Sequence, residues 1–148
     1  MSSLRILSAA YMFLCAGSVA ADTFCADLDA LAEHGATQGL MLSETLIPMA
    51  AQAGECRTSR ALSGARHVQC SWSFGYRAVE AAEVFEGLTA RVAACLGSEA
   101  TMTSDSSVNH PDAYDLRMFD RYGQAFAVSV KDKGALQQTL VFIRAQQR

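Results

Sequence analysis

The sequence predicts an α+β fold: a two-layer domain with an antiparallel sheet of five to six strands and two helices on one face, in the order α-(β)-β-β-α-β-β-β. Two segments have apolar residues at helical spacing, and several others alternate apolar with polar residues. The length of 148 residues fits one such domain. Only 18% of the residues are charged and the net charge is −3, which argues against a disordered chain and against a nucleic-acid-binding protein.

Residues 1–21 have the features of a cleaved secretory signal. Arg5 precedes an apolar run over residues 6–15, and only small residues and one valine follow up to the expected cleavage site. The apolar run is too short for a membrane span of about 20 residues. We therefore expect a mature domain of residues 22–148, periplasmic or secreted, with no membrane span and a net charge of −4 after the loss of Arg5.

Four cysteines remain after removal of the leader, and an even number in an exported chain predicts two disulfides with three possible pairings. Cys56 and Cys70 lie equally far from Ser63, so a hairpin centred there would place them opposite one another. Cys25 lies near the start of the first expected helix and Cys95 near the end of the second. Antiparallel packing of these helices would bring the two residues together, so we favour the pairs Cys25–Cys95 and Cys56–Cys70.

The first half of the mature chain contains one helix and one hairpin. Residues 23–34 form the expected helix, with an apolar face that includes Leu28. For residues 36–53 the sequence permits a short strand, a short helix, or both, because a proline interrupts the apolar run. Residues 56–62 lead into a Ser-Gly turn, and residues 68–77 then alternate strictly, as in a strand with one buried face.

The second half of the chain predicts a helix followed by a three-stranded meander. Residues 80–96 form the best helix, with one apolar stripe. Residues 98–112 are polar and predict an exposed, mobile loop. Residues 114–118, 126–130 and 136–144 are the last three strands. The expected core consists of Phe24, Leu28, Leu31, Trp72, Phe74, Phe85, Leu88, Val92, Leu116, Val128, Leu140 and Phe142.

No motif in the chain predicts catalysis, a metal site or a cofactor. The cysteines do not form a C-x-x-C pair, and their spacings do not suit zinc. No two histidines are four residues apart, and His34 lies at the end of the first helix, where a positive charge is favourable. An enzyme would have to assemble its site in the fold, and His67, His110 and Asp112 are the best candidates for it.

Two sets of residues are candidates for an interface. Residues 22–54 hold five acids and no lysine or arginine, whereas residues 55–77 hold four arginines against one glutamate. The basic segment would dock an anionic partner, face the acidic first helix, or be solvated; we favour the latter two. In a two-layer fold, the sheet face away from the helices would also be open, and apolar side chains there would mark an interface. The candidate interface residues are Arg57, Arg60, Arg66, Arg77, Tyr114, Phe119, Tyr122, Val141 and Ile143.

These observations favour a non-enzymatic binding module of the inhibitor, immunity or adaptor type, which acts on another envelope or secreted protein. We expect a protein partner or a homo-oligomer and no nucleic acid. The alternatives are a small periplasmic enzyme whose site is assembled only in the fold, and an envelope protein without a small ligand.

Overall fold

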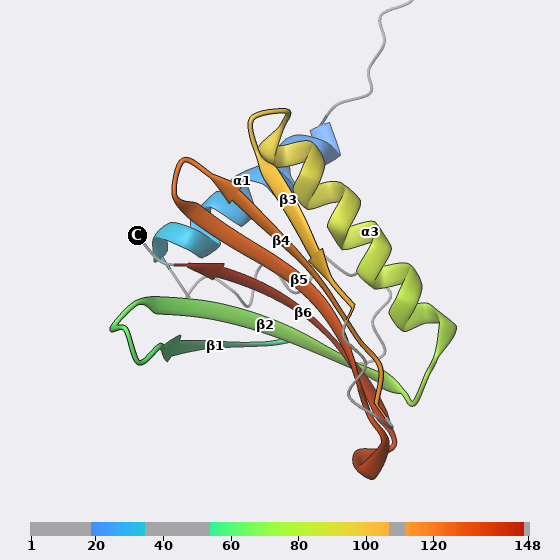
Figure 1. The fold of residues 1–148 in the computed structure, drawn as a ribbon. Coiled ribbons are helices and arrows are strands. Elements are labelled where there is room, and N and C mark those ends of the chain that lie inside the picture. The colour runs from blue at the N-terminus through green and yellow to red at the C-terminus, as the bar shows by residue number, and fades with distance from the viewer. Residues whose placement is uncertain (1–18, 35–53, 107–111, 147–148) are drawn as a thin grey trace, which may run out of the picture.

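The computed structural model describes residues 19–34, 54–106 and 112–146 of the chain. The described part contains two helices, six strands and one short 3₁₀ turn (Figure 1). In chain order these are α1 (Val19–His34), β1 (Glu55–Arg60), β2 (Arg66–Gly75), α3 (Val79–Leu96), β3 (Thr101–Asp105), β4 (Tyr114–Arg121), β5 (Gln124–Lys133), η1 (Gly134–Leu136) and β6 (Gln138–Gln146). The expected segment 36–53, the expected leader up to residue 18 and His110 lie outside the described residues.

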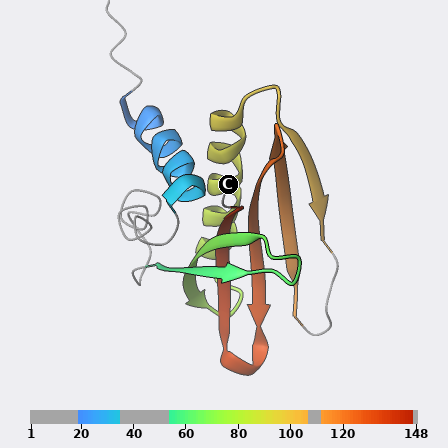
Figure 2. The same cartoon turned by 90° about the vertical axis from the view of Figure 1, so that its left-hand side faces the viewer.

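All six strands belong to one antiparallel sheet, in the order β1-β2-β6-β5-β4-β3. Among the described strands, four consecutive pairs form hairpins, and one pairing between strands far apart in the sequence joins β6 to β2. Both helices lie on the same side of the sheet (Figure 2). The predicted fold class, an α+β domain with two helices on one face of an antiparallel sheet, is therefore confirmed.

The two helices bury the apolar stripes that their sequences predict. On α3 the buried side chains include Phe85, Leu88 and Val92, and this stripe packs on β5 and β6. Gly97 ends α3 with a φ of 70°, which costs a glycine little, and its N–H donates to the carbonyl of Ala93. The other helix, α1, packs against α3 and the β2–β6 pair. It begins at Val19, four residues before the expected start, so its first residues belong to the segment assigned to the leader.

Two disulfides join the pairs that the sequence favours. Cys56 lies directly opposite Cys70 in the β1–β2 ladder, as the expected hairpin requires, and their Cα atoms are 3.9 Å apart. Cys25 of α1 is bonded to Cys95 of α3, with their Cα atoms 5.2 Å apart. Paired cysteines fit an oxidising, extracytoplasmic compartment, since cytoplasmic thiols are kept reduced.

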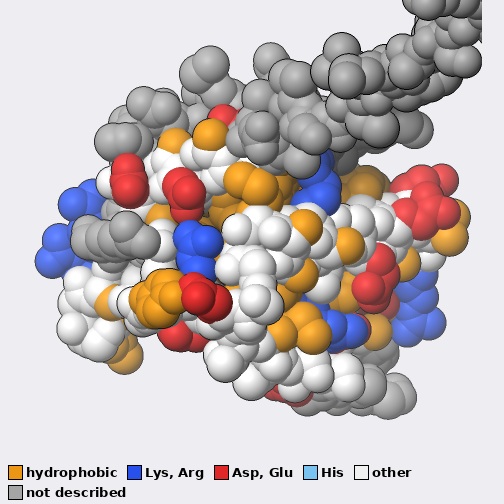
Figure 3. Space-filling model, turned by 90° about the horizontal axis from the view of Figure 1, so that it is seen from above, with side chains coloured by type: hydrophobic (Ala, Val, Ile, Leu, Met, Phe, Trp, Pro, Cys, Tyr) orange, Lys and Arg blue, Asp and Glu red, His pale blue; other side chains and the backbone are white. Residues whose placement is uncertain are grey.

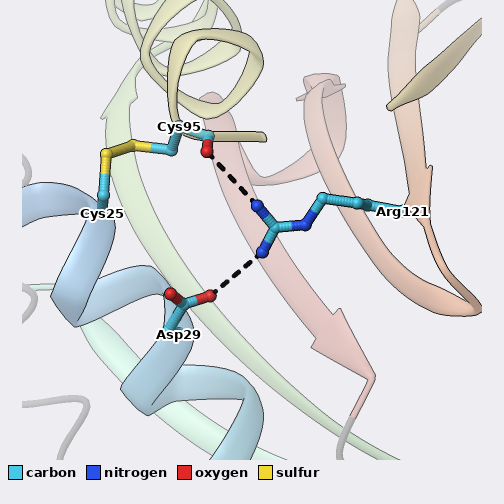
Figure 4. Close-up of a disulfide and its surroundings, with 4 residues drawn as sticks. All are labelled: Cys25, Asp29, Cys95 and Arg121. Atoms are coloured by element: carbon cyan, nitrogen blue, oxygen red, sulfur yellow. Dashed lines mark hydrogen bonds and ion pairs between the residues drawn. A yellow bond between two sulfur atoms is a disulfide. The ribbon is translucent and has the colours of Figure 1, made fainter. Parts of the chain in front are cut away.

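Arg121 of β4 joins the sheet to both helices beside the second bridge (Figure 4). One end of its guanidinium donates to the carbonyl of Cys95 at 3.4 Å, and the other lies 3.5 Å from a carboxylate oxygen of Asp29 on α1. The last turn of α3 has no basic residue of its own. Arg121 therefore supplies the positive charge that the end of a helix favours.

The expectation of an exposed loop over residues 98–112 is wrong in part, because Thr101–Asp105 form the edge strand β3. Its backbone pairs with β4, from Thr101 opposite Asp120 to Asp105 opposite Leu116. All five side chains of β3 are exposed, so no apolar alternation reveals the strand in the sequence. The strand is held by its ladder with β4.

The prediction of which face of β6 is buried is also wrong. Val141 and Ile143 are fully buried against the helices, whereas Leu140 and Phe142 are half-buried on the opposite face. The pairing explains this, because Val141 lies opposite the buried Trp72 of β2, and directly paired residues share a face. The sequence could not decide the face, since β6 is apolar on both.

The same inversion occurs on β4. Phe119 is buried opposite Phe126, and Leu116, which the sequence places in the core, lies on the other face. Arg117 and Asp115 take the inward positions and form an ion pair. The guanidinium of Arg117 lies 5.3 Å from the ring centroid of Phe85 on α3. The aliphatic part of the Arg117 side chain therefore covers this inward position, and the aromatic ring stabilises its charge.

Among the residues that the structure describes, no helix is long and apolar enough to cross a membrane.

Candidate binding surface on the open face of the sheet

The sheet face opposite the helices, the outer face, has a trough along β5. The side chains of β5 on this face are small, namely Ala125, Ala127 and Ser129. Larger side chains flank them on both neighbouring strands, because directly paired residues share a face. They are Leu140, Phe142 and Arg144 on β6, and Tyr114, Leu116 and Met118 on β4. Small residues between two rows of large ones leave a depression, which we call the β5 trough.

Two adjoining hollows of about 250 Å³ and 150 Å³ occupy the β5 trough and its margins. Both are lined by Ala127 and Arg144. The larger extends across the sheet to edge strand β3 on one side and to β2 on the other. Its remaining outer-face lining is His67, Thr101, Thr103, Met118, Asp120 and Ala125, and that of the smaller hollow is Gln69, Tyr114, Leu116, Ser129 and Phe142.

Arg144 is the charged group common to both hollows. It is exposed and lies directly between Gln69 of β2 and Ala127 of β5, neither of which is an acid. Within residues 19–34, 54–106 and 112–146, its guanidinium makes no hydrogen bond or ion pair. A cation in this position can pair with a carboxylate or another anion that enters the trough.

The positive charge of Arg144 acts on the phenol of Tyr114 in the wall of the trough. Burial raises the pKa of the Tyr114 phenol above its ordinary value; the charge of Arg144 opposes this shift, and the carboxylates of Asp105 and Asp115 add to it. The ammonium of Lys131 also lies over the Tyr114 ring, 5.8 Å from its centroid. This part of the outer face therefore combines aromatic and aliphatic surface with two cations, Arg144 and Lys131, and with the carboxylate of Asp105 at the edge strand.

His67 and Asp120 line the larger hollow, but the structure does not bring them together as a catalytic pair. They lie on β2 and β4, with β6 and β5 between them, which places their backbones about 14 Å apart. An oxygen of Asp120 accepts a bond from the Gly123 N–H at 3.3 Å within the β4–β5 turn. In the part of the chain that the structure describes, no histidine donates to a carboxylate and no three metal-ligating side chains cluster.

Asp112, another candidate for chemistry, has a structural role instead. Its carboxylate accepts a hydrogen bond of 2.8 Å from the Gly134 N–H, which fixes the chain entering β4 against the β5–β6 turn.

The structure separates the four candidate arginines. Arg57 is exposed and lies 2.7 Å from the carboxylate of Glu55. Arg60 and Arg66 lie directly opposite one another at the tip of the β1–β2 hairpin. Arg77 is at the other end of β2, where it bonds Asp132 and Thr139 near the β5–β6 turn, at 3.2 and 2.8 Å. A single docking patch of four arginines is thus ruled out. On the side of the molecule seen in Figure 3, charges of both signs are interspersed.

The apolar candidates for the outer face divide in two. Phe119, Val141 and Ile143 are buried in the core, so their assignment to an interface is wrong. Tyr114 lies on the outer face, in the wall of the β5 trough. Tyr122 is 80% exposed in the β4–β5 turn, and its hydroxyl donates to Glu99, which raises the pKa of the phenol.

Apart from Tyr114, the large side chains that flank the trough are not among the predicted interface residues: Leu116, Met118, Leu140, Phe142 and Arg144. The strict alternation of apolar and polar residues in β2 is the pattern from which they could have been identified. Once β6 is paired with β2, the face of every residue on β6, β5 and β4 follows from the register.

Comparison with known proteins assigns no family. No family model and no curated protein sequence matches the chain. Among solved structures, the chain is similar to CalU16 from Micromonospora echinospora, with 10% sequence identity and a TM-score of 0.29, over 66% of this chain and 69% of that one. A likeness at this level carries no argument about function.

Proposed function

We propose that the protein is a non-enzymatic binding module that holds an apolar, acidic segment of another exported protein in the β5 trough. The observation that carries this proposal is Arg144, an exposed cation between two adjoining hollows, with no acid opposite it in either neighbouring strand. A partner carboxylate would pair with the guanidinium while flanking apolar side chains fill the hollows.

The size of the hollows favours side chains over a small-molecule ligand. Binding sites for drug-sized ligands usually measure about 300–1,000 Å³ and enclose most of the ligand. The two hollows here are smaller, at about 250 and 150 Å³, and both lie on the solvent side of the sheet. One or two apolar side chains would fill each, in the way that anchor residues fill pockets at protein interfaces.

The proposed compartment is the periplasm or the extracellular medium. It rests on the signal-like residues 1–21 and on the two disulfides, which need an oxidising environment. The partner would therefore be an envelope or secreted protein.

Selection from a displayed peptide library tests the proposal. The mature, oxidised protein is the bait, and peptides that also bind the Ala127→Trp variant are removed, because Ala127 lines both hollows and an indole at this position would obstruct them. We expect enriched sequences to contain an aspartate or glutamate flanked by apolar residues. Their affinity should fall by about tenfold or more in Arg144→Ala, as expected for loss of a charge-assisted contact.

Arg57→Ala is the matched control, since Arg57 is also exposed and lies in the same row of the outer face, but is already paired with Glu55. This variant should bind the selected peptides as the wild type does. Selection without a common motif, or equal losses in Arg57→Ala and Arg144→Ala, would refute binding in the trough.

A further inference from the structure

The two edges of the sheet are protected to different degrees. Edge strand β1 has three charged residues in six, and a disulfide ties it to β2. Edge strand β3 has the sequence Thr-Met-Thr-Ser-Asp, with one charge at its end. Charged residues, prolines and bulges are the usual devices that prevent an edge strand from pairing with another chain. β3 lacks all of these along its first four residues, and its five side chains are exposed.

We infer that β3 is a dimerisation edge, through which two copies of this chain pair antiparallel about a two-fold axis at Thr103. In this register, Thr103 lies opposite Thr103 of the second copy, and a directly opposed threonine pair is favourable in antiparallel sheets. Thr101 of one copy lies opposite Asp105 of the other, so its hydroxyl can donate to the carboxylate. The strand is thus complementary to itself.

The inward side of the same register also fits. Met102, which is 55% exposed, lies opposite Ser104 of the second copy, and the pairing covers part of the thioether side chain. Each pair of contacts occurs twice, as a two-fold interface requires. A two-fold axis that relates antiparallel strands in one sheet is perpendicular to that sheet, so both copies keep their helices on the same side.

The dimer would present two β5 troughs on one continuous face. Thr101 and Thr103 line the larger hollow, so the seam between the copies would run along its margin. A partner with two binding segments, or a dimeric partner, would gain avidity from such an arrangement. Dimerisation rests on β3 alone, and it would hold whether or not the trough binds a peptide.

Sedimentation equilibrium of the mature, oxidised protein tests the inference, over about 10 µM to 1 mM, where a small interface is expected to associate. We expect a monomer–dimer equilibrium in this range. Thr103→Lys places two lysines directly opposite one another at the axis and should raise the dimer Kd by about tenfold or more. Thr58→Lys is the matched control: it makes the same change in the middle of the exposed edge strand β1 and should leave the dimer Kd unchanged.

A cysteine trap tests the register. Thr103→Cys should give an intermolecular disulfide on mild oxidation, because the two copies of this residue face each other. Met102→Cys should give far less, since Met102 faces Ser104. A wild-type protein that remains monomeric at 1 mM, or a dimer weakened by Thr58→Lys and not by Thr103→Lys, overturns the inference. Equal trapping at residues 102 and 103 overturns the register.

Discussion

Truncation of two adjacent residues on β6 tests which face of this strand is buried. Ile143 is fully buried and lies opposite Cys70 of β2 and Val128 of β5, both in the core. Phe142 is half-buried on the outer face, where it lies opposite Ser71 and Ser129. We predict that Ile143→Ala destabilises the protein far more than Phe142→Ala, although phenylalanine loses the larger side chain.

The magnitudes follow from the two environments. Ile143→Ala removes three carbon atoms from a site without solvent access, which typically costs 2–5 kcal/mol; we expect about 3 kcal/mol. Phe142→Ala removes a cross-strand contact with small polar neighbours, and such contacts contribute roughly 0.2–1 kcal/mol relative to alanine. For a domain of this size, a loss of about 3 kcal/mol lowers the Tm by roughly 10 °C, and a loss of 1 kcal/mol by a few degrees.

Equilibrium unfolding in urea, with both disulfides intact, gives the two free energies directly. The m-value should be unchanged in both variants, which would show that the same surface is exposed on unfolding. If Phe142→Ala costs as much as Ile143→Ala, the assignment of faces on β6 is refuted, and with it the β5 trough.

Three further predictions address the disulfides, one ion pair and one hydrogen bond. Removing the α1–α3 disulfide, whose cysteines are 70 residues apart, should lower the free energy of unfolding by about 4.4 kcal/mol, and removing the β1–β2 disulfide, with a separation of 14, by about 3 kcal/mol. The opposite ranking in urea unfolding would contradict this chain-entropy estimate. Arg121→Met should lower the free energy of unfolding by about 0.5–1 kcal/mol, because the substitution removes a cation from the end of α3, and this loss should shrink in high salt. A loss that is independent of salt would point to packing instead. Glu99→Gln should lower the raised pKa of the Tyr122 phenol toward 10.0 by removing its carboxylate partner, as measured by ultraviolet titration against Tyr122→Phe; an unchanged pKa would exclude this hydrogen bond.

Two features of the candidate surface depend on distance in the chain and could not be predicted locally. Arg144 and Leu116 are 28 positions apart, and only the β4–β5 and β5–β6 pairings bring them to opposite sides of Ser129 and Ala127. Arg121 is likewise 92 residues from Asp29, and its role at the end of α3 has no counterpart in the helix sequence.

The elements with a single apolar face could be predicted from the sequence. The stripe of α3, the strict alternation of β2 and the equal spacing of Cys56 and Cys70 about a turn each permit one arrangement, because the wrong face would expose most of the apolar surface. These features were enough for the α+β class and for the favoured disulfide pairs. The faces of the other strands depend on how the strands pair. β6 is apolar on both faces, β4 places an ion pair inward, and β3 is polar throughout, so the local pattern fixes neither their faces nor, for β3, the existence of a strand. Their side chains are assigned by hydrogen-bond register to β2 and β5, a long-range property that periodicity along one segment does not contain.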